Sequence, residues 1–182
     1  MKCAARFSAG SCLLWAAACA TAERDEAPAP VAQHREEILA TLDAFFVALA
    51  SSDADAVAAL HSPGAVNVIA EPEKGDAIRY RPVTEMIDRM RSGSFPKFQE
   101  RYWDPIVLER GGLAVVWTSY SIEKGGERLH CGVDIFNLSR HDGVWKIDDL
   151  NFTMEPSACD EITPGALSVV RPDFSALEAK EN

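Results

Sequence analysis

Residues 98–155 decide the fold. They read FQERYWDPIVLERGGLAVVWTSYSIEKGGERLHCGVDIFNLSRHDGVWKIDDLNFTME. Four runs rich in β-branched and aromatic residues are separated by the turn signals ERGG, KGGE and HDGV, which are typical of tight β-hairpin loops. The stretch therefore predicts a four-stranded antiparallel meander. At its centre, the run HCGVDIF (130–136) places two ionisable side chains, His130 and Asp134, inside a strand.

Two-residue loops fix which residues lie opposite each other, and successive side chains point to alternate faces. Loops at 110–111, 125–126 and 142–143 gather the following residues on one face: Glu100, Tyr102, Asp104, Ile106, Leu108, Leu113, Val115, Trp117, Ser119, Ser121, His130, Gly132, Asp134, Phe136, Leu138, Trp145, Ile147, Asp149, Asn151 and Thr153. This face is apolar near the first and third turns and polar near the second. Such a gradient is typical of a pocket with an apolar closed end and a polar mouth.

The opposite face is expected to be apolar in its middle as well. It would carry Trp103, Val116, Thr118, Tyr120, Val133, Ile135, Leu150 and Phe152. Helices can cover only one face of such a sheet, so an uncovered apolar face predicts a partner. The simplest partner is a second copy, and we expect a homodimer.

The segment before the meander supplies the helices. Apolar residues at helical spacing, including Leu42, Phe45 and Leu49, predict a helix over 33–50. A short helix over 54–60, strands over 65–70 and 77–81, and a helix from Pro82 to about residue 91 follow. The expected fold is α+β: a cone formed by a strongly curved antiparallel sheet, with three N-terminal helices on its concave face.

The N-terminus has the pattern of a secretion signal. Lys2 and Arg6 precede an apolar run that is too short to form a permanent membrane span. Two processing routes fit: residues 1–19 are a lipoprotein signal with lipid attached to Cys19, or ordinary cleavage occurs near residue 22. Residues 20–32 form an Ala-Pro-rich linker, 33–159 the domain and 160–182 a loosely docked tail. We expect a periplasmic location in a bacterial cell envelope, with membrane contact only through the lipid, or secretion.

Composition narrows the function classes. Hydrophobic residues make up 47% of the chain, which is ample for a packed core. The formal net charge of -10 argues against nucleic acid as a partner, since phosphate binding needs a basic face. After processing, Cys131 and Cys159 remain. They either form a disulfide, as an oxidising compartment permits, or are two small buried residues that never meet.

Several motifs resemble one superfamily. ERYWDP (100–105), AVVW (114–117), HCGVDIF (130–136) and VWKI (144–147) together resemble the nuclear transport factor 2-like (NTF2-like) superfamily, in its SnoaL-like or lumazine-binding branch. Cys159 stands where such chains often place a closing cysteine. The resemblance implies the cone fold. It leaves function open, because the superfamily includes isomerases, cyclases, dehydratases and non-catalytic modules.

The candidate chemistry centres on Asp134. It would act as a proton-abstracting base whose pKa is raised in a dry pocket, with His130 or Tyr102 donating to a developing oxyanion. His130 and Asp134 lie about 13 Å apart along the strand, at about 3.3 Å per residue, and are therefore not a direct pair. The ligand-binding residues would be Glu100, Asp104, Trp117, Ser119 and Asn151. The competing interpretation is structural: a buried Asp134 accepts hydrogen bonds from Asn151, Trp117 or the backbone.

Three functions remain in order of preference. The first is a non-catalytic exported domain that binds a small hydrophobic or amphipathic molecule. The second is a SnoaL-like acid–base isomerase, dehydratase or cyclase. The third is an assembly module whose pocket is filled by its own side chains. No ligand spacing for a metal and no cofactor motif is recognised, so neither is predicted.

Overall fold

The computed structural model describes residues 32–165. Its helices are α1 (Arg35–Ser51), α2 (Ala54–Leu60) and α3 (Val83–Arg91), and its strands are β1 (His61–Glu71), β2 (Ala77–Pro82), β3 (Gln99–Arg110), β4 (Leu113–Lys124), β5 (Glu127–His141) and β6 (Val144–Thr153). The expected elements are confirmed in order and type. Most boundaries differ by one or two residues, and the largest difference is that β1 begins at His61, directly after α2, where a turn was expected.

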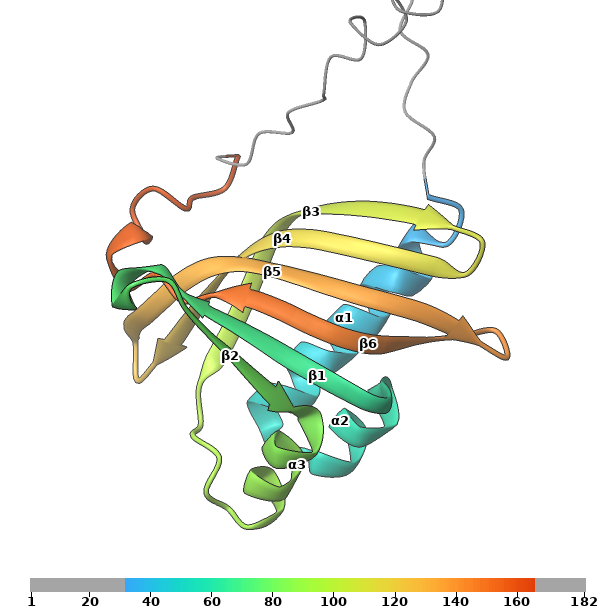
Figure 1. Ribbon diagram of the computed structural model, residues 1–182, viewed down its shortest axis with the longest axis horizontal. Helices are drawn as coiled ribbons and strands as arrows, with labels where there is room; N and C mark the ends of the chain where they lie inside the picture. The colour runs from blue at the N-terminus through green and yellow to red at the C-terminus, as the bar shows by residue number, and fades with distance from the viewer. Residues whose placement is uncertain (1–31, 166–182) are drawn as a thin grey trace, which may run out of the picture. The chain divides into compact units, whose positions relative to one another are not determined.

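The six strands form one sheet in the order β2-β1-β6-β5-β4-β3. All described neighbours are antiparallel except β1 and β6, which run parallel, so the sheet is mixed where a purely antiparallel one was expected. The helices lie on one face of the sheet, with α1 running behind the meander in Figure 1. We call this the inner face and the opposite one the outer face.

The core lies between α1 and the inner face. The apolar stripe of α1 buries Ile38, Leu42 and Phe45, and Phe45 makes an edge-on aromatic contact with Phe136 of β5 at 5.7 Å between ring centroids. Each such side chain contributes roughly 1.5–3 kcal/mol through burial. The core is densest toward the first and third hairpins, where Leu138, Trp145 and Ile147 are buried.

Each hairpin of the meander has a two-residue loop, and each contains a β-bulge farther along. The loops are 111–112, 125–126 and 142–143, so the first lies one residue beyond its expected position. In the first hairpin the bulge is at Asp104 and Pro105, in the second at Leu129 and in the third at Asp148. A bulge adds one unpaired residue, which turns every side chain beyond it to the other face.

The bulges correct the expected faces. On β4, Val116, Thr118 and Tyr120 belong to the inner face with Asp134 and Phe136, while Leu113, Val115, Trp117 and Ser119 belong to the outer face. On β3, Ile106 and Leu108 lie opposite Trp117 and Val115 and are therefore also on the outer face. On β6, Leu150 and Phe152 are on the inner face, and Asp149 and Asn151 on the outer one. The assignment of residues to the two faces that follows from the loop positions therefore holds only up to each bulge.

Cys131 and Cys159 form a disulfide, with their Cα atoms 5.1 Å apart. The alternative that the two residues never meet is therefore wrong. The bond ties the segment after β6 to β5, where the backbone N–H of Glu155 also donates to the Cys131 carbonyl oxygen at 2.9 Å. Linking residues 28 positions apart stabilises the fold by about 3–4 kcal/mol in the chain-entropy model.

The described residues include no helix that is long and apolar enough to cross a membrane. The expected signal segment, Cys19 and the linker up to residue 31 lie outside the described residues, as does the tail from residue 166 onward.

Gly132 is fixed by its neighbours. It pairs with Tyr120 of β4, and a Cβ atom at this position would overlap the Thr153 carbonyl oxygen and come within 2.8 Å of the Tyr120 ring. The Tyr120 hydroxyl donates to that same carbonyl oxygen at 2.6 Å. Only glycine lets the β5 backbone approach β6 and Tyr120 this closely.

We predict that Gly132→Ala lowers the free energy of unfolding by about 3 kcal/mol or more, because backbone atoms must move to admit the methyl group. Gly112→Ala is the control. Gly112 has a positive φ of 86°, but a Cβ atom there would meet only Arg140 Cβ at 3.8 Å, an ordinary contact, so we expect a loss of about 1–2 kcal/mol. Urea denaturation measures both. Equal losses for the two variants would contradict the close approach.

Candidate functional site

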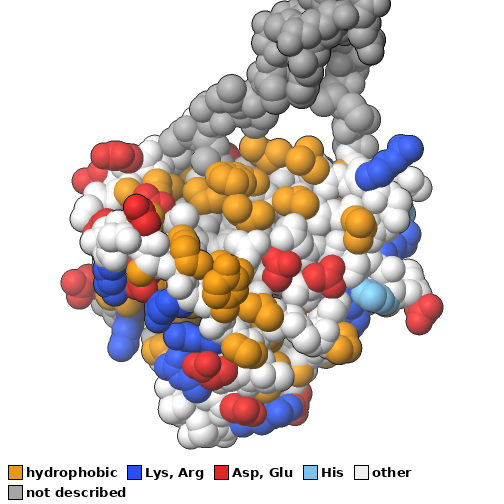
Figure 2. Space-filling view, viewed as in Figure 1, with side chains coloured by type: hydrophobic (Ala, Val, Ile, Leu, Met, Phe, Trp, Pro, Cys, Tyr) orange, Lys and Arg blue, Asp and Glu red, His pale blue; other side chains and the backbone are white. Residues whose placement is uncertain are grey.

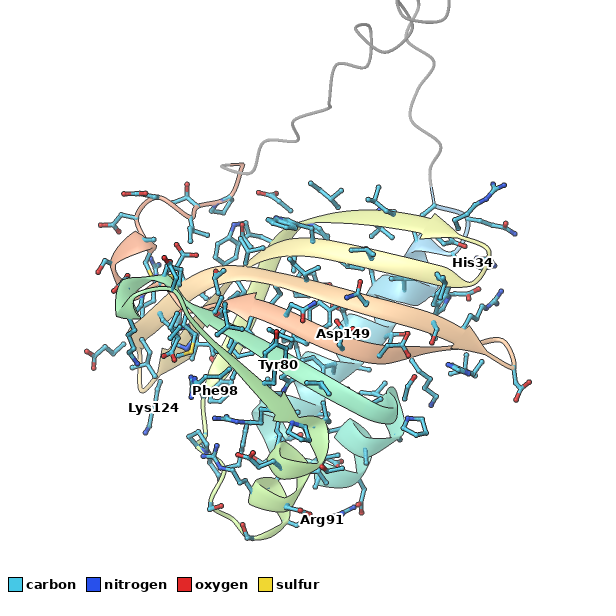
Figure 3. All side chains as sticks on the ribbon, viewed as in Figure 1. His34, Tyr80, Arg91, Phe98, Lys124 and Asp149 are labelled. Atoms are coloured by element: carbon cyan, nitrogen blue, oxygen red, sulfur yellow. A yellow bond between two sulfur atoms is a disulfide. The ribbon has the colours of Figure 1, made fainter. Side chains whose placement is uncertain are left out.

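A cavity of about 240 Å³ lies between the inner face and the helices, toward the second hairpin. Its apolar lining comes from all parts of the domain: Phe45, Leu49, Ile69, Met86, Phe95, Pro96, Phe98, Ile122, Leu150, Phe152 and Met154. Figure 3 labels Phe98, which precedes β3 on this side of the fold. Its polar lining is Asn67, Arg79, Arg81, Arg89, Glu100, Tyr120, His130 and Asp134. An apolar hollow with a few convergent polar groups is typical of a small-molecule site.

Asp134 is the deepest ionisable group of the cavity. Its side chain projects from the middle of β5, opposite Thr118 and Phe152, and only 1% of the residue is exposed. Neither carboxylate oxygen has a hydrogen-bond partner among the described residues. Burial, and secondarily the charge of Glu100, raise the pKa of Asp134 well above its ordinary value. The neutral carboxyl form is thereby favoured.

Glu100 reaches the same cavity from β3, where it lies opposite Ile122. It is partly buried, and desolvation raises its pKa to about 8. Two neighbouring carboxyls in a poorly solvated site disfavour the state in which both are charged. The pair therefore retains a proton to a higher pH than two separate surface carboxyls would.

His130 and Tyr120 form the wall beside these acids. The Tyr120 hydroxyl donates its only proton to the Thr153 carbonyl oxygen, so the contact of 3.1 Å with His130 Nδ1 requires the imidazole to donate. Burial lowers the pKa of His130, which favours the neutral ring. The histidine is then protonated on Nδ1, and Nε2 is its hydrogen-bond acceptor.

Asn67 of β1 adds another orphaned polar atom. Only 6% of the residue is exposed, and its Oδ1 atom has no hydrogen-bond partner among residues 32–165. An unsatisfied buried polar group costs about 1–3 kcal/mol. The cavity thus presents unpartnered oxygens on Asn67 and Asp134, both more than nine-tenths buried.

Three of the predicted site residues line the cavity: Asp134, His130 and Glu100. As expected, His130 and Asp134 are not a direct pair. The ring of His130 is hydrogen-bonded to the Tyr120 hydroxyl instead. The structural alternative for Asp134 is wrong, because Asn151 and Trp117 lie on the outer face and no backbone group within residues 32–165 bonds its carboxylate.

Tyr102 does not line the cavity, although it was expected to donate to an oxyanion. It lies on the inner face, but its hydroxyl donates to Asp43 Oδ1 of α1 at 2.6 Å and its ring stacks on Phe46 at 5.0 Å. The hydrogen bond and the ring stacking therefore make Tyr102 a link between β3 and α1. Burial and the hydrogen bond to Asp43 raise the pKa of its hydroxyl.

The other four expected ligand-binding residues also lie outside the cavity. Asp104 is exposed at the bulge with φ 54°, and one of its carboxylate oxygens accepts from the Gly165 backbone. Trp117 is 41% exposed on the outer face, where Ser119 is buried. Asn151 is on the outer face as well and donates to Asp149 Oδ1 at 3.0 Å. The bulges account for these four corrections.

Tyr120, Asn67 and the three arginines line the cavity but were not predicted as site residues. Pro105 inside a strand was a usable signal for the first bulge, because proline in a sheet is confined to edges and bulges. No comparable signal marks the bulges at Leu129 and Asp148. For Arg79 and Arg81, the signal was the alternation of apolar and charged residues in Ile-Arg-Tyr-Arg (78–81), which places both arginines on one face of the expected strand.

The two carboxyls of the cavity can form hydrogen bonds with a ligand and can exchange protons with it. A neutral carboxyl donates a hydrogen bond, and its ionised form accepts a proton, so the acid pair can play either role in a cavity that largely excludes water. No group of three or more His, Cys, Asp or Glu residues within 32–165 is placed to hold a metal ion.

Comparison with known proteins identifies the fold. The sequence matches no protein-family model, and no curated protein is similar to it. Solved structures are similar: an NTF2-like protein from Cytophaga hutchinsonii (19% identity, 66% of this chain and 97% of that one, TM-score 0.53) and a protein of unknown function from Mycobacterium tuberculosis (12%, 73% and 81%, 0.56). Another is assigned as the beta subunit of an aromatic-ring-hydroxylating dioxygenase from Novosphingobium aromaticivorans (13%, 66% and 88%, 0.55). The chain has the NTF2-like fold.

The raised pKa of Asp134 predicts a pH-dependent stability. Between the ordinary pKa of 3.8 and the raised one, the folded state binds a proton that the unfolded state has lost. The free energy of unfolding therefore falls as pH rises through this window, by up to about 1.4 kcal/mol per pH unit. Asp134→Asn removes this loss, so its stability relative to wild type should increase from pH 4 upward.

Urea denaturation at a series of pH values measures this difference. Asp149→Asn is the matched control, because Asp149 lies on the outer face and accepts hydrogen bonds from Asn137 and Asn151. Parallel pH profiles for Asp134→Asn and wild type would contradict the raised pKa.

Proposed function

Starting from the NTF2-like fold, we propose that this protein is an exported domain that binds a small hydrophobic or amphipathic molecule in the cavity around Asp134. The observation that carries the proposal is the buried Asp134 carboxyl, which has no partner among the described residues and lines an apolar cavity. A ligand that hydrogen-bonds this group would recover the desolvation cost of about 1–3 kcal/mol. Apolar burial would supply the remaining affinity.

A second candidate function is acid–base catalysis of an isomerisation, dehydration or cyclisation. It is supported by the neighbouring Asp134 and Glu100 carboxyls, whose raised pKa values bring them closer to neutral pH, where a general base is most effective. The ionised Asp134 would take a proton from carbon, and a protonated Glu100 would donate to the resulting oxyanion. Binding remains the preferred function, because it needs only the unpartnered groups. The open cavity disfavours a pure assembly module with a filled pocket.

Export is part of the proposal. It is supported by the signal-like N-terminus, with lipid on Cys19 or cleavage near residue 22, and by the Cys131–Cys159 disulfide, which persists in oxidising compartments. The chain would then act on the periplasmic side of a bacterial envelope or after secretion.

Binding is tested with N-phenyl-1-naphthylamine, an uncharged apolar dye whose fluorescence rises in a dry site. We expect saturable enhancement with the wild-type protein. Ile122→Trp should weaken binding by about ten-fold or more, because Ile122 lines the cavity and a larger side chain would occupy it.

Val144→Trp is the control for dye binding, because Val144 is exposed in the third hairpin, away from the cavity lining. The proposal fails if the dye shows no saturable enhancement, or if both tryptophan variants bind it as the wild type does.

We also propose a homodimer that forms through the outer face. Leu108, Leu113, Val115 and Trp117 are exposed there on adjacent strands β3 and β4. Figure 2 shows hydrophobic side chains gathered on the side of the sheet that faces the viewer. Exposed apolar groups in such a cluster are typical of a protein–protein interface.

Trp117→Glu is expected to give a monomer, because two charges would be buried at a symmetric interface. Tyr80→Glu, on the distant edge strand β2, should leave the dimer intact. Size-exclusion chromatography with light scattering at micromolar concentration measures both. A monomeric wild-type protein would contradict the proposal.

A further inference from the structure

Strand β2 turns its charged side chains toward the cavity and leaves its apolar side chains exposed. Its residues Arg79 and Arg81 lie opposite Ile69 and Asn67 of β1 and line the cavity with them. Ile78 and Tyr80, which alternate with the arginines, are 52% and 75% exposed. A strand with one buried face ordinarily turns its apolar residues inward. Here the two arginines line the cavity instead, so the contents of the cavity must account for their orientation.

Ion pairing within the protein explains only one of these cations. Arg79 Nε lies 2.8 Å from Glu71 Oε2, and Glu71 is nearly buried and also accepts from Lys74. Arg79 is therefore needed to neutralise Glu71. Its neighbour Arg81 has only Glu85, at 3.3 Å and half exposed, which is a weak surface pair.

Arg89 joins the same lining from α3. Within residues 32–165 it forms no salt bridge, and its guanidinium carbon lies 5.8 Å from the centroid of the Phe95 ring. A guanidinium held against an aromatic ring keeps its planar donors free for a carboxylate. Arg81 and Arg89 therefore present donors that the protein itself does not fully use.

The charge of the cavity lining is also opposite in sign to the net charge of the chain. The whole sequence carries a formal charge of -10, yet the cavity lining keeps Arg81 and Arg89 against Glu100 and Asp134 once Arg79 is paired with Glu71. Desolvation raises the pKa of both acids, which favours their neutral forms. The lining is thus a positive site within an acidic protein, which favours an anion.

We propose that the ligand is a small amphipathic carboxylate, whose carboxylate group binds Arg81 and Arg89 and whose apolar body fills the cavity toward Asp134 and Asn67. This inference rests on the proposed binding function. The orientation follows from burial: the Arg81 side chain is 31% exposed and marks the mouth, whereas Asp134 is 1% exposed and marks the floor. The volume of about 240 Å³ lies below the usual range for drug-sized ligands and favours a ligand no larger than the dye or a ten-carbon chain.

A polar group on the far end of the ligand would complete the fit. Asp134 in its neutral form donates one hydrogen bond, and Asn67 Oδ1 accepts one. A hydroxyl or an enol can satisfy both. A purely aliphatic carboxylate would bind by its head group and leave these two groups unpaired.

The test uses decanoate and decan-1-ol, which have the same alkyl chain and differ in charge. Each is titrated against purified protein carrying bound N-phenyl-1-naphthylamine, at concentrations below those at which either compound aggregates. We expect decanoate to displace the dye about ten-fold more tightly than decan-1-ol, as charge-assisted hydrogen bonds predict. Raising the salt concentration should reduce this preference.

Arg89→Met removes the charge but keeps an unbranched side chain. We expect it to abolish most of the preference for decanoate while leaving decan-1-ol binding within about two-fold of wild type, since apolar burial is unchanged. Arg91→Met is the matched control. Arg91 lies on the same helix, is labelled at the far lower end of α3 in Figure 3 and pairs with Asp55 at 2.8 Å outside the cavity.

The outcomes separate the inference from the function it rests on. If the dye and decan-1-ol bind but decanoate has no advantage, the carboxylate inference is wrong and the binding function stands. The inference also fails if Arg91→Met lowers the preference as much as Arg89→Met does. If neither the dye nor either alkyl compound binds, the proposed function is wrong as well.

Discussion

The alternation of side chains along a strand is the constraint on which the site depends, because a single unpaired residue reverses it. Three bulges, one in each hairpin, decide what faces the helices. They turn Trp117, Ser119 and Asn151 outward. The second bulge sets Asp134 opposite Thr118, and the register beyond it brings Tyr120 onto the inner face. Glu100 and Asp134 stay on one face because the first two bulges both lie between them and their effects cancel.

Much of the fold was predictable because its signals are local. Helical periodicity gave α1, and Gly-Gly and Asp-Gly pairs gave the hairpins, each of which is confirmed. The gradient of the inner face, apolar near the first and third turns and polar near the second, also survives in the core and the cavity. The residues that form the gradient changed on β3, β4 and β6. Bulges at Leu129 and Asp148 depend on packing between strands, which leaves no local mark in the sequence.

The site follows the same division. Asp134, His130 and Glu100 were found because ionisable residues are unusual in a buried strand. Arg79, Arg81 and Arg89 were not predicted as site residues because charged side chains in a sequence are ordinarily solvated. Only the pairing of β2 with β1 shows which way Arg79 and Arg81 point. The disulfide remained open for a similar reason, since sequence does not give the distance between Cys131 and Cys159. Contacts between distant segments therefore carry most of the functional information.

The proposed binding site depends on a buried Asp134 carboxyl that stays in its neutral form. Carbon-13 NMR of protein labelled at aspartate carboxyls, with Asp134→Asn used to assign the signal, measures this directly. We expect the Asp134 signal to keep the chemical shift of a protonated carboxyl well above pH 4 and to change when the cavity is filled with N-phenyl-1-naphthylamine. Ionisation near the ordinary pKa of 3.8, with no response to the dye, would contradict it.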